Sequence, residues 1–170
     1  DMPNSAVCRL VEYLKNNNIE LGGLRGPLKP SQLFVKLWHE LETDDVQPVV
    51  ELKLYQLDEV DHAIRTPGRL VQAGPEHQAL VHAWVTAFSI EVALPHGGPT
   101  QASIASRIAM GEYYFWEVGE TMTCIAGKNA QPHHGVSHVG PVYTPPEHRG
   151  HGYATDVSAA LSQLILDEGA

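Results

Sequence analysis

The pattern that most constrains the fold is a pair of short, apolar-rich segments on either side of a two-residue turn. Residues 113–118 read YYFWEV and residues 121–126 read TMTCIA, with Gly119 and Glu120 between them. Aromatic and β-branched residues flanking a short glycine-containing turn predict a β-hairpin. Of the four aromatic residues at 113–116, we expect one pair, Tyr113 with Trp116 or Tyr114 with Phe115, to lie in the core. The other pair is then available for the wall of a pocket.

Helical patterns and further strands surround this hairpin. We expect a strand over 69–73, a helix from the Gly-Pro-Glu at 74–76 to about residue 92, and a weaker helix over 100–110. A strand over 136–144 and a helix over 153–166 follow. The expected inner face of the first helix is Leu80, Val81, Trp84, Val85, Phe88 and Val92, and that of the last is Ala154, Val157, Leu161, Leu164 and Ile165. This order predicts an α/β (α+β) fold, with a mixed, mostly antiparallel sheet flanked by helices.

The first third of the chain has its own pattern. It predicts helices over 5–17, with Asn4 or Ser5 as N-cap, and over 31–43, with Pro30 just before the start, and then a strand over 49–57. We expect a small N-terminal α/β extension at 1–60 that covers the main domain, a linker at 61–68 and the main domain at 69–170. The chain ends directly behind a helical pattern, so we expect it to be a piece of something longer.

Composition excludes some classes of partner. The 170 residues include 20 acidic and 11 basic ones, a net charge of −9 with histidine neutral. A surface that binds nucleic acid or an anionic membrane needs a cationic face, so neither partner is expected. No run approaches the roughly 20 apolar residues of a membrane span, and no secretory leader pattern opens the chain. We therefore expect a cytoplasmic protein, with Cys8 and Cys124 as reduced thiols.

Five histidines gather in the second half of the chain, and their spacing raises the possibility of a metal site. They are His133, His134, His138, His148 and His151. No cysteine or carboxylate completes a zinc-binding set with them. We expect no metal.

The segment that carries chemistry reads VYTPPEHRGHGYA at 142–154, where a strand runs through a glycine-containing loop into a helix. The first amides of a helix have no internal partner and point along the positive end of its dipole, so they hold phosphate groups without lysine. Gly150 and Gly152 leave the backbone open to close approach. Neither the dinucleotide fingerprint nor the P-loop pattern is present. The segment by itself predicts an anion site but leaves open an ordinary surface turn.

The same segment resembles the acetyl-CoA motif of the GNAT family of N-acetyltransferases, a hydrophobic strand and a proline followed by R/Q-x-x-G-x-G/A. Arg149, Gly152 and Ala154 fall on its anchor positions, and the order of elements from residue 69 follows the family. The stretch is most similar to a bacterial subgroup with an added N-terminal domain. Two positions depart from that subgroup: His151 replaces a basic Arg or Lys, and Asp156 replaces a small or apolar residue. We expect Asp156 to weaken diphosphate binding unless its carboxylate points away.

The resemblance implies acetyl-CoA as co-substrate and direct transfer of the acetyl group to a primary amine on a small molecule or peptide. The residues implied for cofactor binding are Val142, Tyr143, Thr144, Arg149, Gly150, His151, Gly152, Tyr153, Ala154 and Thr155. Glu91 and Tyr143 are candidates for catalysis, and Phe88, Glu91 and Trp116 for the acceptor pocket. The general acid is expected beyond Ala170.

Two other functions are compatible with the same sequence. One is a non-catalytic module that binds or senses acyl-CoA, and the other is a generic anion-binding α/β protein. The sequence predicts no oligomeric state.

Overall fold

A computed structural model of the chain describes residues 2–39, 55–61, 63–93, 98–129 and 136–169. The chain divides into two compact units, residues 1–53 and residues 54–170. This boundary falls earlier than residue 60, where the sequence pattern places the end of the N-terminal extension.

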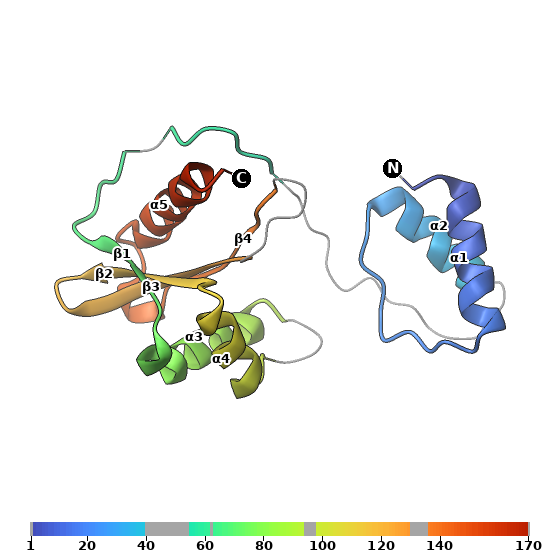
Figure 1. The fold of residues 1–170 in the computed structure, drawn as a ribbon, viewed down its shortest axis with the longest axis horizontal. Coiled ribbons are helices and arrows are strands. Elements are labelled where there is room, and N and C mark those ends of the chain that lie inside the picture. Colours follow the sequence, from blue (N-terminus) through green and yellow to red (C-terminus); the bar gives the residue numbers. More distant parts are fainter. Residues whose placement is uncertain (1, 40–54, 62, 94–97, 130–135, 170) are drawn as a thin grey trace. The chain divides into compact units, whose positions relative to one another are not determined.

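The first unit contains a pair of helices, α1 (Asn4–Asn16) and α2 (Leu28–His39), which pack against each other (Figure 1). Their small core consists of Val7, Val11, Phe34 and Trp38. The Phe34 and Trp38 rings stack with centroids 5.6 Å apart, and Lys15 Nζ donates a hydrogen bond to the Trp38 carbonyl oxygen at 3.1 Å. Both predicted helices are therefore present.

Three details of this unit differ from the prediction. Pro3 occupies the N-cap position of α1 without a side-chain cap, so Asn4 and Ser5 both lie inside the helix. Pro30 lies in the first turn of α2, not before it; its missing N–H breaks no helical bond there, because the first turn has no internal acceptor. The predicted strand over 49–57 falls mostly outside the described residues, and residues 55–57 are not in a strand.

The second unit is built on an antiparallel sheet. Its strands are β1 (Arg69–Gln72), β2 (Tyr113–Val118), β3 (Thr121–Lys128) and β4 (Val139–Tyr143), in the order β1-β2-β3-β4. Phe115 lies opposite Ile125, and Ile125 opposite Tyr143. The predicted hairpin is confirmed, with Gly119 at φ +62° in its turn. β4 is shorter than the predicted strand over 136–144 and forms an edge of the described sheet.

Helices cover both faces of this sheet (Figure 1). A short 3₁₀ turn (Pro75–His77), α3 (Gln78–Glu91) and α4 (Gln101–Ala109) cover one face, and α5 (Tyr153–Asp167) covers the other. These helices and the α/β fold class are as predicted. Two expected inner-face residues are exposed, Val92 just past the end of α3 and Ala154 in the first turn of α5.

The aromatic run at 113–116 supplies the core on both faces. Tyr113 and Phe115 pack on the side of α3 and α4 with residues such as Val81, and Tyr114 and Trp116 pack on the side of α5. The predicted pairing was wrong, because side chains of a strand alternate and residues 113 and 116 face opposite ways. Both pairs are buried because both faces of the sheet are covered.

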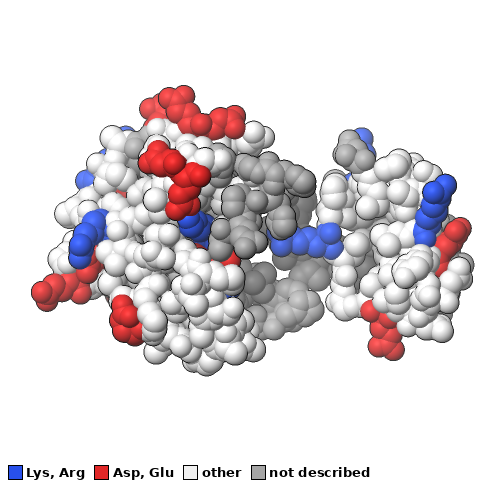
Figure 2. All heavy atoms as spheres, in the orientation of Figure 1, with Lys and Arg blue, Asp and Glu red and all other residues white. Residues whose placement is uncertain are grey.

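No described helix is long and apolar enough to cross a bilayer. On the face of each unit drawn in Figure 2, the lysines and arginines of the described residues are scattered and form no continuous patch. Acidic side chains lie between them on the same face.

Candidate functional site

A groove opens where three elements end close together: the C-terminus of α3, the end of β4 and the turn that leads into α5. Its volume is about 420 Å³. It is lined by Phe88, Glu91, Val92, Val142, Tyr143, Thr144, His148, Arg149, Gly150, Gly152, Tyr153 and Ala154. The structure thus brings together most of the predicted cofactor-binding residues with two of the predicted acceptor residues, Phe88 and Glu91. Sequence reasoning did not single out His148 as a groove residue.

The turn before α5 presents a run of free backbone donors. Within the described part of the chain, the amides of residues 150–154 have no hydrogen-bond partner, and no side chain caps α5. Gly150 and Gly152 have φ values of +81° and +92°, an alternation that turns successive N–H groups toward a concave surface. Together with the dipole of α5, these amides form a cradle suited to an anion.

Two of the residues implied for cofactor binding, Arg149 and Thr155, already use their backbone amides. The Arg149 N–H donates to the Pro146 carbonyl oxygen at 3.3 Å, and the Thr155 N–H donates to the Gly152 carbonyl oxygen at 3.0 Å. The free donors therefore belong to residues 150–154, a narrower set than the sequence predicted.

The Arg149 side chain spans the groove. Its Nε donates to the Thr144 carbonyl oxygen at 2.9 Å, and its Nη2 donates to Glu91 Oε2 at 2.6 Å. The guanidinium also lies 5.7 Å from the centre of the Tyr143 ring. The hydrogen bond to Glu91 raises the pKa of Arg149 further above its usual value, so this group stays charged at any working pH. Arg149 thus connects the end of α3 to the end of β4.

Tyr143 and Trp116 differ in their access to this groove. Tyr143 lines it, although its side chain packs mainly in the core on the α3 side. Trp116 is 2% exposed beneath α5, and its Nε1 donates to Thr66 Oγ1 at 3.0 Å. Trp116 is not among the groove-lining residues, so its assignment to an acceptor pocket finds no support in the geometry.

His151 lies outside the groove lining although it stands in the middle of the loop. Its ring stacks on Tyr153, with centroids 5.3 Å apart, and its Nδ1 lies 3.2 Å from the His148 carbonyl oxygen. Among the described residues, no three His, Cys, Asp or Glu side chains gather in an arrangement that could hold a metal ion. His133 and His134 fall outside the described residues.

Asp156, the acid in the first turn of α5, is directed away from the groove. Its side chain is 2% exposed, and its Oδ2 accepts hydrogen bonds from the Thr66 N–H at 2.7 Å and the Arg65 N–H at 3.2 Å. The carboxylate therefore fastens the segment before β1 to the start of α5. The expectation that Asp156 weakens diphosphate binding requires its carboxylate to face the groove, and Asp156 is not among the groove-lining residues.

A thiol lies directly behind the groove wall. The Thr144 hydroxyl donates a hydrogen bond to Cys124 Sγ at 3.1 Å, and Cys124 is fully buried. Burial raises the pKa of the Cys124 thiol to about 11, because the charged thiolate is poorly solvated there. Cys124 is therefore a neutral packing group at physiological pH.

We expect only one of the two thiols to be alkylated rapidly in the folded chain. Iodoacetamide at pH 8 should alkylate the half-buried Cys8 first and reach Cys124 only in denaturant, because alkylation requires an accessible thiolate. Peptide mass spectrometry of the time course measures both rates. Equal rates at the two cysteines in native buffer would contradict the buried position of Cys124.

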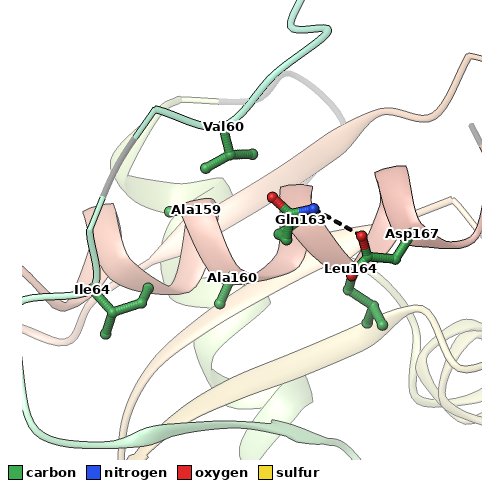
Figure 3. Close-up of a pocket in the computed structure, with 7 residues that line it drawn as sticks. All are labelled: Val60, Ile64, Ala159, Ala160, Gln163, Leu164 and Asp167. Atoms are coloured by element: carbon green, nitrogen blue, oxygen red, sulfur yellow. Dashed lines mark hydrogen bonds between the residues drawn. The ribbon is translucent and has the colours of Figure 1, made fainter.

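A second hollow lies on the outer side of α5, between that helix and the side chains of Val60 and Ile64 (Figure 3). Val60 and Ile64 point toward the helix, where Ala159, Ala160 and Leu164 line the space. Its volume is about 330 Å³, and its polar groups include Gln163 and Asp167, which bond to each other at 2.8 Å. The described residues that line this hollow include neither a cation nor a run of free amides like that of the groove, so the groove is the better candidate site.

Comparison with known proteins adds a likeness of fold. No family model matches the sequence, and the comparison with curated proteins found no match. A crystal structure from Novosphingobium aromaticivorans, described as an acetyltransferase of the GNAT family, is similar with a TM-score of 0.44 and 18% sequence identity. The likeness covers 65% of this chain and 45% of that chain, so this chain matches less than half of that protein's length. The α/β class rests on the antiparallel sheet and its two helical layers, and the chemistry of the site rests on the groove itself.

Proposed function

We propose that the second unit binds acetyl-CoA and supports transfer of the acetyl group to a primary amine. The observation that supports this most directly is the run of amides at 150–154, which have no hydrogen-bond partner among the described residues and open to a groove along Val142–Thr144. No described heavy atom lies within 4 Å of where a Cβ would stand on Gly150, so the cradle is open at that position. At Gly152 the nearest atom is the Thr66 methyl carbon, 3.5 Å from where a Cβ would stand. A diphosphate is the ligand group whose charge and oxygens fit such a cradle.

The strand beside the cradle is suited to hold the rest of the ligand. β4 pairs with β3 along one edge, and its other edge has no partner among the described strands. An extended amide-containing arm can pair with such an edge as an added strand does. In this arrangement the diphosphate lies on the amides at 150–154, and the pantetheine arm lies along Val142–Thr144.

Catalysis in such a site consists mainly of holding two reactants together. The amine attacks the thioester carbonyl, the carbon–sulfur bond breaks, and one proton leaves the amine while the thiolate gains one. A groove that orients both partners supplies proximity, and a carboxylate near the amine can accept its proton. Glu91, on the α3 side with Phe88, is the candidate for binding the amine or accepting that proton.

A second function is favoured by one observation. The Glu91 carboxylate is paired with Arg149 at 2.6 Å, so it is not free to act as a base in this state. A module that binds or senses acyl-CoA without turnover would need nothing more than the amide cradle and the strand edge.

Two measurements on the full chain distinguish these functions. Calorimetry should show acetyl-CoA binding that ATP or inorganic phosphate cannot match, and release of free thiol should appear with at least one member of a panel of primary amines. Binding without thiol release across a broad panel would support the sensing module. Preference for nucleotides, with no competition by coenzyme A, would overturn both in favour of a generic anion site.

Several sequence-based expectations stay predictions. These are a cytoplasmic location, a small-molecule or peptide amine as acceptor with no nucleic-acid or membrane partner, and an N-terminal extension at 1–60 joined to the main domain by a linker at 61–68.

A further inference from the structure

The ion pair between Arg149 and Glu91 crosses the groove. An anionic cofactor would need the charge of Arg149, and a cationic amine would need the charge of Glu91. Arg149 directly precedes the first free amide, that of Gly150, so its guanidinium is the cation nearest to the anion cradle in sequence. Glu91 is held on the opposite wall, at the last residue of α3. Both side chains are about half exposed, at 43% and 53%, so the pair can open without unpacking the core.

A phosphate and the Glu91 carboxylate are like charges, and both are attracted to the same guanidinium. One edge of that guanidinium is already committed, with Nε on the Thr144 carbonyl oxygen and Nη2 on Glu91. A diphosphate on the amides at 150–154 would draw Arg149 toward itself and would repel the carboxylate. Exposed ion pairs are weak, so an anion bound through several amides can outcompete this one.

We propose that a bound anion and Glu91 compete for Arg149, and that anion binding thereby frees Glu91 to bind a cationic amine. Glu91 is then the residue that selects a positively charged acceptor, and it does so only once the cofactor is in place. The coupling is reciprocal: the factor by which the bound anion raises the affinity for the amine equals the factor by which the bound amine raises the affinity for the anion. This inference rests on the proposed function for the identity of the anion, coenzyme A.

The first test measures coenzyme A binding by calorimetry for the wild type, Glu91→Gln and Glu147→Gln. Glu147 is a matched control, because its exposed carboxylate lies two residues before Arg149 and none of the hydrogen bonds described for Arg149 involves it. Glu91→Gln should tighten binding about two- to fivefold at low ionic strength, the size expected for loss of one exposed competitor. The gain should shrink in high salt, which screens such charges. Glu147→Gln should leave the affinity within about 1.5-fold of wild type.

The second test measures spermidine, a cationic amine, with and without coenzyme A present. Wild type should bind spermidine several-fold more tightly in the presence of coenzyme A, and Glu91→Gln should lose that gain. The inference would be overturned by unchanged or weaker coenzyme A binding in Glu91→Gln, or by equally tightened binding in Glu91→Gln and Glu147→Gln. It would also be overturned if coenzyme A still tightened spermidine binding in Glu91→Gln.

Failure of the proposed function gives a different result. If the wild type does not bind coenzyme A, the acetyl-CoA assignment falls, and the same variants titrated with inorganic pyrophosphate test the competition for Arg149 alone. Absence of binding to pyrophosphate as well would overturn the inference together with the anion cradle.

Discussion

Gly150→Asp is expected to weaken acetyl-CoA binding by about 100-fold while the chain stays folded. The new carboxylate would lie beside the free amides at 150–154, where it accepts their hydrogen bonds and repels a diphosphate. Two unit charges about 6 Å apart repel by about 2.8 kcal/mol at an effective dielectric constant of 20, and each 1.4 kcal/mol changes affinity about tenfold, which together give the expected loss. Calorimetry with acetyl-CoA measures the loss.

Two controls separate charge from backbone strain. Gly150→Ala adds a Cβ at the same positive φ without the charge, and it should lose much less affinity than the aspartate variant. Gly119→Asp adds the same carboxylate at another positive-φ glycine, φ +62°, which also has no described atom within 4 Å of the added Cβ. It lies in the β2–β3 turn and should bind acetyl-CoA as the wild type does. Full affinity in Gly150→Asp would contradict the site.

Asp156→Ala is expected to lower the free energy of unfolding by about 2–3 kcal/mol. The carboxylate is 2% exposed and accepts two backbone N–H groups, of Arg65 and Thr66. Its removal leaves donors without their partner and takes away an acid from the favourable end of α5. Urea unfolding followed by circular dichroism measures the change.

Asp167→Ala is the matched control, because Asp167 is an acid of the same helix that is exposed and bonds only to Gln163 among the described contacts. It should stay within about 0.5 kcal/mol of wild type. Asp156→Asn keeps one carbonyl oxygen as acceptor, so its free energy of unfolding should fall between those of Asp156→Ala and the wild type. Equal stability of Asp156→Ala and the wild type would show that the Thr66 contact adds nothing.

Local patterns were sufficient to predict most elements of this chain. The hairpin at 113–126 was predictable because β-rich residues flank a glycine turn, and α5 because its apolar residues recur at helical spacing. The strand, glycine loop and helix start that form one side of the groove were predictable for the same reason, because they adjoin in the sequence at 142–154 and their geometry is local.

Contacts between distant segments were not predictable in this way. Nothing near Asp156 in the sequence indicates that its carboxylate accepts a hydrogen bond from the N–H of Thr66, ninety residues earlier. The burial of Trp116 required knowing that helices cover both faces of the sheet. The pairing of Glu91 with Arg149 similarly depends on where α3 ends relative to β4, which tertiary packing decides.

The most direct test of the anion cradle is to follow the backbone amides by nitrogen–proton correlation NMR while acetyl-CoA is added. The largest shifts should fall on residues 150–154, with smaller ones along Val142–Thr144 at the strand edge. Saturating ligand that leaves those five amides unmoved, or that shifts the hollow beside Val60 and Ile64 instead, would contradict the account.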